Sequence, residues 1–172
     1  MKYIALLRGI NVGGRNIKMT ALRDCFVGMG YGQVKTILAS GNVMFETDIQ
    51  DVAALRAKIE ARVGKQFGYR AIIFVYSEDV IKKILLADPF APVDSNFHDY
   101  VAFFDGGFEK RLGDFHSPDA DVERTQVGDG VLYWVVQKGM TLTSRLAKEM
   151  NQSIYREHCT VRNTNTLRKL IT

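Results

Sequence analysis

Ala71-Ile72-Ile73-Phe74-Val75-Tyr76 predicts a strong strand, because its residues after Ala71 are β-branched and aromatic. Before it, a helix is predicted over about 51–67, where apolar residues recur at the spacing of one helical face. Two strands are predicted before that helix, at 34–38 and 43–47, joined by a polar turn.

The N-terminal part completes this pattern. Residues 2–7 form an apolar run that ends at Arg8-Gly9, which predicts a buried strand. A helix follows, with its apolar face marked by Leu22, Cys25, Phe26 and Met29. The resulting order, β-α-β-β-α-β, is that of a ferredoxin-like α+β fold.

The second half repeats this plan in a degraded form. A helix capped by Ser77 is predicted to run to about residue 87, and 88–98 is the best boundary between halves. A strand is expected at 100–104, followed by a hairpin of 123–127 with 131–136 and a helix at 142–150. A short helix at about 165–170 comes last, without a clear strand before it. We therefore expect two ferredoxin-like subdomains, 1–88 and 89–172, the second packed with the first.

Composition places the chain among ordinary globular proteins, with 47% hydrophobic and 24% charged residues. No segment approaches the roughly 18 apolar residues of a membrane span, and the N-terminal apolar run is too short for a signal peptide. Cys25 lies on an apolar helix face and is expected in the core, whereas Cys159 has no clear place. These features predict a cytoplasmic protein without membrane association.

Charge is unevenly distributed along the sequence. Residues 1–35 have six basic and one acidic residue, and residues 138–172 have seven and two. The middle, 36–137, has ten basic and sixteen acidic residues. If the two ends meet in space they form a basic patch; otherwise these charges are solvated helix faces.

The loop 8–14 is the most unusual local feature. A glycine-rich turn after a buried strand can direct several backbone N–H groups at one anion, and Arg8 and Arg15 flank it. Gly9 to Gly14 has the glycine spacing of a P-loop, but Arg15 and Asn16 stand where that motif needs Lys and Ser or Thr. The alternative is a tight strand-to-helix connection that needs glycine for its backbone angles alone.

Two further polar segments are candidates. The turn Ser40-Gly41-Asn42 is explained by turn chemistry or by a site, and the topology leaves open whether it lies near the first loop. The segment Thr160 to Thr166 precedes the last helix, where Asn163 or Asn165 would be the N-cap beside Arg162.

Other kinds of site have little support. The three histidines, His98, His116 and His158, lack metal-ligand spacing, so no metal is predicted. The acidic residues of 114–123 fit a solvated loop better than a cation site. Phe74, Tyr76, Phe103 and Phe104 are expected in the core rather than on an RNA-binding sheet.

The three polar segments carry a family resemblance over essentially the whole chain. Leu6 to Gly14, Ser40 to Phe45 and Thr160 to Thr166 resemble a bacterial family of conserved hypothetical proteins, the domain of unknown function numbered sixteen ninety-seven. One departure is Thr164, where the family usually has tryptophan; if that tryptophan packs on a ligand, this chain binds differently. The resemblance implies no activity, substrate or cofactor.

We therefore expect a binding module for an anionic ligand, either nucleic acid or a nucleotide phosphate, and no cofactor. The alternatives are an enzyme acting on a small phosphorylated or carboxylated metabolite, and a structural or partner-binding protein. The sequence does not decide whether there is catalysis, nor the oligomeric state. The predicted ligand-binding residues are Arg8, Asn11, Gly13, Gly14, Ser40, Gly41, Asn42, Arg162, Asn163, Asn165 and Thr166.

Overall fold

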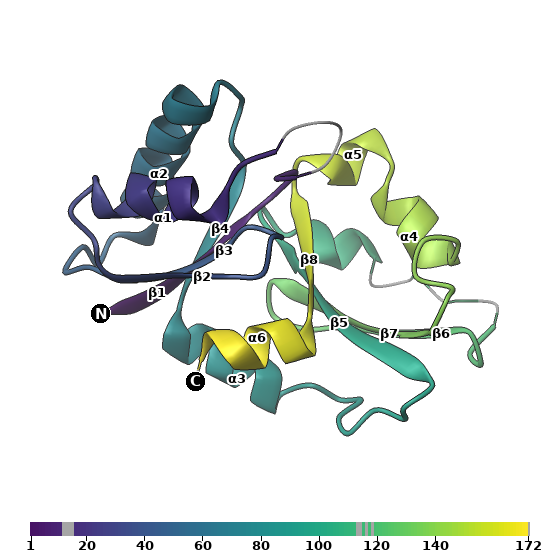
Figure 1. Ribbon diagram of the computed structural model, residues 1–172. Coiled ribbons are helices and arrows are strands. Elements are labelled where there is room, and N and C mark those ends of the chain that lie inside the picture. The colour runs from purple at the N-terminus through teal and green to yellow at the C-terminus, as the bar shows by residue number, and fades with distance from the viewer. Residues whose placement is uncertain (12–15, 113–114, 116, 118, 172) are drawn as a thin grey trace. The chain divides into compact units, whose positions relative to one another are not determined.

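The structure, a computed structural model, describes residues 1–11, 16–112, 115, 117 and 119–171. Helices and strands are interspersed along the chain, and the strands form two four-stranded antiparallel sheets, which confirms the α+β class (Figure 1). The chain divides into two compact units. The first unit is Met1–Ile84 with Arg168–Thr172, and the second is Leu85–Leu167.

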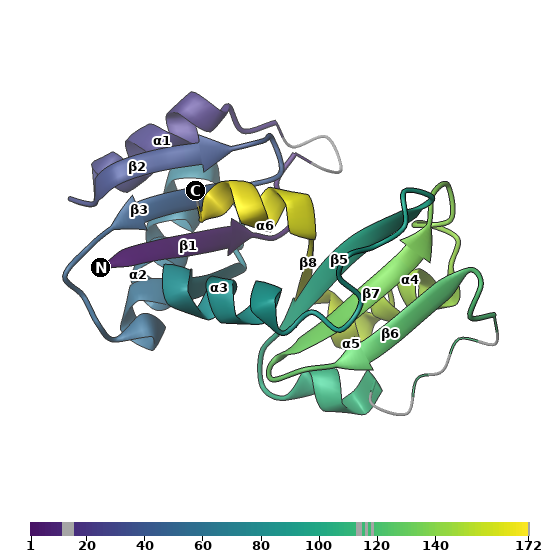
Figure 2. The same ribbon diagram turned by 90° about the horizontal axis from the view of Figure 1, so that it is seen from below.

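The first unit begins with the predicted order of elements. These are β1 (Lys2–Leu7), α1 (Met19–Val27), β2 (Gly32–Ile37), β3 (Asn42–Glu46), α2 (Val52–Phe67), β4 (Ile73–Ser77) and α3 (Glu78–Leu86). The order of strands in the sheet is β2-β3-β1-β4, and β1 pairs antiparallel with both β3 and β4. Helices α1 and α2 cover one face of this sheet, and α3 lies on the other face (Figure 2).

The core of the first unit follows from alternation along β1. Tyr3, Ala5 and Leu7 point to the face covered by α1 and α2 and belong to one buried cluster. Ile4 and Leu6 point to the opposite face and are also buried. A strand buried on both faces reads as a continuous apolar run, which is why β1 shows no polar alternation.

Helix ends in the first unit are set by local side chains. The Asp51 carboxylate accepts a hydrogen bond from Ala54 N at 3.0 Å and caps α2. Gly68 ends α2 with φ of 68°, a left-handed conformation that favours glycine. Ser77 Oγ accepts from Val80 N at 3.3 Å at the start of α3, which confirms the predicted cap.

The second unit builds its sheet in the same relative order. Its elements, the last of which runs on into the first unit, are β5 (Phe97–Phe104), a 3-10 helix η1 (Phe108–Leu112), β6 (Glu123–Val127), β7 (Val131–Gln137), α4 (Arg145–Met150), α5 (Ser153–Arg156), β8 (Cys159–Asn163) and α6 (Thr164–Leu170). The sheet order is β6-β7-β5-β8, with β5 antiparallel to both β7 and β8. The hairpin of β6 and β7 confirms the prediction from Gly128-Asp129-Gly130.

Strand β8 corrects the sequence analysis, which found no clear strand before the last helix. Cys159–Asn163 pairs with β5 at the edge of the sheet, with Ala102 opposite Val161 and Phe103 opposite Thr160. The strand is short and polar, so its local sequence gives a weak strand signal. Its hydrogen bonds come from β5, more than fifty residues earlier in the chain, and a local pattern cannot detect them.

Helices in this region also differ from the prediction. The helix expected from residue 142 begins at Arg145, where Ser144 Oγ accepts from Ala147 N, and Leu142 is 86% exposed. Helix α5 was not predicted, because four residues are too few to show helical periodicity.

The core of the second unit lies between its sheet and helices α4 and α5. It contains alternate residues of β5 and β7, among them Phe104 and Trp134, packed with Leu146 and Tyr155. Phe74, Phe103 and Phe104 are buried, which confirms their predicted place in the core, and Tyr76 is half-buried. Among the described residues, no helix combines the length and the apolar character needed to cross a bilayer.

Candidate functional site

The loop after β1 lies directly against the turn between β2 and β3. The sequence had left open whether these two segments are neighbours. Leu7 N donates a hydrogen bond to Gly41 O at 2.8 Å, and Asn11 Nδ2 donates to Ala39 O at 2.8 Å. Two of the three predicted polar segments therefore form one surface in the first unit. We call Arg8–Asn11 with Ala39–Asn42 the loop–turn surface.

Gly41 makes this close approach possible. Its φ of 76° lies in the left-handed region, and a Cβ atom there would meet the Ile10 side chain and would lie 2.9 Å from Leu7 Cβ. The close contact, and not only the backbone angle, therefore requires glycine at this position.

Asn11 braces the loop from within. It has a φ of 56°, a conformation in which asparagine is enriched, and its Oδ1 accepts from Ile17 N at 2.6 Å. The bond joins the two described ends of the loop, since residues 12–15 lie between them. The predicted backbone donors Gly13 and Gly14 lie outside the described residues. Arg8 N donates to Ile72 O at 2.9 Å, which fixes the backbone of Arg8 and leaves its side chain half-exposed.

Asn42 has a structural role in the turn. It is fully buried, and its Nδ2 donates to Ile37 O and to Ser40 Oγ, both at 2.9 Å. These two bonds use both hydrogens of the amide. A contribution of Asn42 to ligand binding stays a prediction, whereas Ser40 is exposed on the same turn.

The third predicted segment lies in the second unit, on β8 and at the start of α6. Arg162 is buried, and its Nη1 donates to Thr160 Oγ1 and to Val161 O, both at 2.8 Å. Asn163 Oδ1 accepts from Asn165 N at 2.9 Å, which confirms the predicted cap. Arg162 and Arg8 belong to different units, and their convergence on one ligand stays a prediction.

Thr164, the departure from the family pattern, points inward. It is buried, and its Oγ1 donates to Asp99 Oδ2 at 3.0 Å. Thr166 is half-buried and Asn165 is exposed. In this chain, position 164 therefore anchors the start of α6 to β5.

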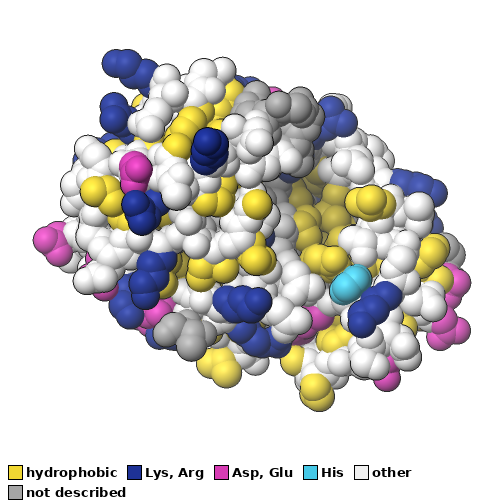
Figure 3. All heavy atoms as spheres, in the orientation of Figure 1, with side chains coloured by type: hydrophobic (Ala, Val, Ile, Leu, Met, Phe, Trp, Pro, Cys, Tyr) yellow, Lys and Arg dark blue, Asp and Glu magenta, His cyan; other side chains and the backbone are white. Residues whose placement is uncertain are grey.

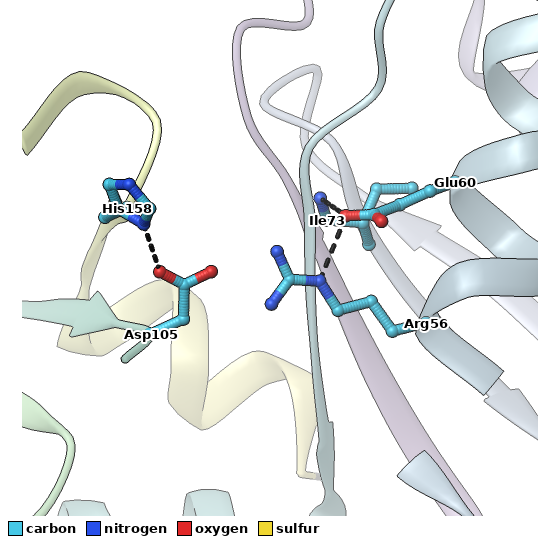
Figure 4. A network of polar contacts seen from close by, with 5 residues as sticks. All are labelled: Arg56, Glu60, Ile73, Asp105 and His158. Atoms are coloured by element: carbon cyan, nitrogen blue, oxygen red, sulfur yellow. Dashed lines mark hydrogen bonds and ion pairs between the residues drawn. The ribbon is translucent and has the colours of Figure 1, made fainter. Parts of the chain in front are cut away.

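A histidine–carboxylate pair in the second unit was missed by the sequence analysis. His158 Nδ1 lies 2.7 Å from Asp105 Oδ1, and the two side chains are 40% and 28% exposed (Figure 4). The Phe108 ring stacks on the imidazole, with centroids 4.0 Å apart and planes at 6°. Phe104 on β5 pairs with Cys159 on β8. Asp105 follows Phe104 and His158 precedes Cys159, so this pairing brings Asp105 and His158 together. No signal in the sequence could reveal this pair, because the existence of β8 was not predicted.

Two glutamates, one in each unit, serve the fold. Glu123, which the sequence placed in a solvated acidic loop, is buried, and its carboxylate accepts from Trp134 Nε1 at 3.2 Å and from Arg145 N at 3.0 Å. It also accepts from Leu146 N, and so caps α4. In the first unit, the half-buried Glu60 accepts from Arg56 Nε and Ile73 N, linking α2 to β4 (Figure 4).

The two units differ in charge. The first has 15 Lys and Arg against 7 Asp and Glu, a formal charge of +8, and the second has 8 against 12, a charge of −4. On the face shown in Figure 3, Lys and Arg side chains outnumber Asp and Glu over the first unit, on the left. The loop–turn surface thus belongs to the basic part of the protein.

Comparisons with known proteins bear on family and fold. The structure is similar to that of a conserved bacterial protein from Streptococcus pneumoniae, with a TM-score of 0.80 and 22% identity over 98% of this chain and 96% of that one. The sequence has no significant match among curated proteins. The family model described as "Protein of unknown function (DUF1697)" matches residues 1–133. The chain therefore belongs to the DUF1697 family, as the three polar segments indicated.

Proposed function

We propose that the first unit binds an anionic ligand, a nucleic acid or a nucleotide phosphate, at the loop–turn surface. The observation that carries the proposal is the +8 formal charge of this unit, against −4 for the rest of the chain. A concentration of positive charge on one unit attracts phosphates from a distance and speeds their binding.

The local geometry supports a defined binding site rather than a general electrostatic attraction. Hydrogen bonds from Leu7 and Asn11 hold the loop against the turn, so the Arg8 backbone and Ser40 are fixed before a ligand arrives. A site held in place in this way loses less conformational entropy on binding. Arg8 would supply charge and paired N–H donors, which suit a phosphate.

Binding of fluorescent oligonucleotides and of nucleotides, measured against salt concentration, tests this proposal. We expect affinity to fall with added salt, and Arg8→Gln to lower the salt slope by about one. Arg156→Gln is the matched control, since it removes the same charge from an exposed position of the second unit. Absence of binding to any of these ligands at low salt, or equal behaviour of the two variants, would contradict the proposal.

A second candidate is an enzyme acting on a phosphorylated or carboxylated metabolite. The pair of His158 and Asp105 favours it, because a carboxylate on Nδ1 orients an imidazole for proton transfer at Nε2. Arg111 lies near, with its guanidinium 4.7 Å from the Phe108 ring centroid, and would attract an anionic group. Screening of phosphate and carboxylate esters for hydrolysis, with His158→Gln as the control, separates this candidate from simple binding.

A further inference from the structure

The first unit contains an open groove between the end of α1 and one side of α2. The groove has a volume of ≈ 540 Å³. Its lining residues are Gly28, Met29, Lys58, Ala61, Arg62 and Lys65. We call it the basic groove, because three of these six described residues are cationic and none is acidic.

The three cations lie on one face of α2. Lys58, Arg62 and Lys65 are spaced by four and then three residues, which places them one above another along the helix. None of them forms an ion pair with a carboxylate of the described residues. Like charges at this spacing repel one another and destabilise a helix. An anion in the groove would remove that cost.

Two of the three side chains are held at the groove by contacts of their own. Lys58 Nζ lies 5.5 Å from the centroid of the buried Tyr31 ring. Burial raises the pKa of the Cys25 thiol, and a hydrogen bond and the positive charge of Arg62 offset part of that rise. Arg62 therefore lies close to Cys25 on α1.

We propose that the basic groove binds successive backbone phosphates of a nucleic acid strand that also contacts the loop–turn surface. This inference rests on the proposed function and narrows its ligand to a polymer. Lys58 and Lys65 are about 10 Å apart along the helix axis, which exceeds the size of one phosphate. The groove has no aromatic side chain among its described lining residues, so the contact is to phosphates and is independent of base sequence.

The position of the groove relative to the loop also favours a polymer. The loop–turn surface precedes α1 and Gly28 follows it, so the nine residues of α1 separate the two surfaces. At about 1.5 Å per residue, α1 is roughly 13 Å long, which exceeds the length of inorganic triphosphate. We therefore expect an oligonucleotide to bind much more tightly than inorganic triphosphate.

The test uses the full chain and three probes: a single-stranded and a double-stranded oligonucleotide of about 12 nucleotides, and inorganic triphosphate. The test variant is Lys58→Gln with Lys65→Gln, which keeps good helix formers on α2 and leaves Arg62 in place. The control is Lys83→Gln with Lys169→Gln, which removes two exposed charges from the same unit. Circular dichroism confirms that both variants fold.

We expect the groove variant to bind oligonucleotides at least about tenfold more weakly at low salt, with a salt slope lower by about two, and the control to change little. Equal loss in the two double variants would overturn the groove proposal. So would triphosphate binding as tight as oligonucleotide binding. If Arg8→Gln weakens binding and the groove variant does not, the groove fails and the proposed function stands. If the unmodified chain binds none of the probes, the groove proposal and the proposed function are both contradicted.

Discussion

Asp105 Oδ1 lies 2.7 Å from Nδ1 of His158, across 53 residues of sequence. An ionised carboxylate can only accept, so the neutral imidazole must carry its proton on Nδ1. We expect nitrogen NMR of His158 to show this tautomer, and Asp105→Asn to reduce its population, because an amide can also donate. Phe108→Leu serves as the control that removes the stacked ring and keeps the carboxylate. An unchanged tautomer in Asp105→Asn would show that the hydrogen bond does not set the imidazole's state.

Removal of the Glu123 carboxylate should destabilise the second unit strongly. Glu123→Ala leaves Trp134 Nε1 and Leu146 N buried without their acceptor, and we expect a loss of about 3 kcal/mol in unfolding free energy. Urea denaturation followed by fluorescence of Trp134, the single tryptophan, measures it at the site. The exposed Asp121 gives the control Asp121→Asn, expected within about 0.5 kcal/mol of the unmodified protein.

Two glycine substitutions should separate steric contact from backbone strain. Gly41→Ala adds a Cβ against Ile10 and Leu7 at a φ of 76°, whereas Gly68→Ala adds one at 68° with nothing within 4 Å. We expect Gly68→Ala to cost about 1 kcal/mol and Gly41→Ala at least about twice that. Thermal and urea unfolding measure both. Equal losses of unfolding free energy in the two variants would mean that the loop moves to accommodate the new methyl group. The loop–turn surface would then not be tightly held.

Stability should fall at alkaline pH. Burial raises the pKa of the Tyr31, Tyr133 and Tyr155 hydroxyls, and negative charge from Asp88 adds to the rise at Tyr133 and from Glu149 at Tyr155. The unfolded chain therefore releases these protons first. The stability that the three groups contribute is complete below the ordinary tyrosine pKa of about 10, and it is lost as the pH rises from that value through their raised pKa in the folded state.

Urea midpoints measured across the alkaline range, beside a tyrosinate absorbance titration, check this expectation. Tyr133→Phe removes one of the three groups and should flatten the pH dependence. A midpoint that stays constant through the ordinary tyrosine pKa would contradict it.

Elements that depend on neighbouring residues could be predicted from the sequence alone. The apolar run of β1, the β-branched residues of β4 and the periodicity of α2 gave their positions, because a residue's neighbours in the chain set local backbone preference and the pattern of burial. The family could also be recognised from its three polar segments.

Features that depend on contacts between distant residues could not be predicted in this way and became visible only in the folded chain. Strand β8 exists because β5 offers it hydrogen bonds, and that pairing alone brings His158 to Asp105. In the same way, Glu123 caps a helix and is not a solvated acid. The reason is that the first backbone N–H groups of α4, 22 residues later in the chain, donate to its carboxylate. A local pattern encodes the propensity of a segment, whereas the partner of a polar group is fixed only when the chain folds back on itself.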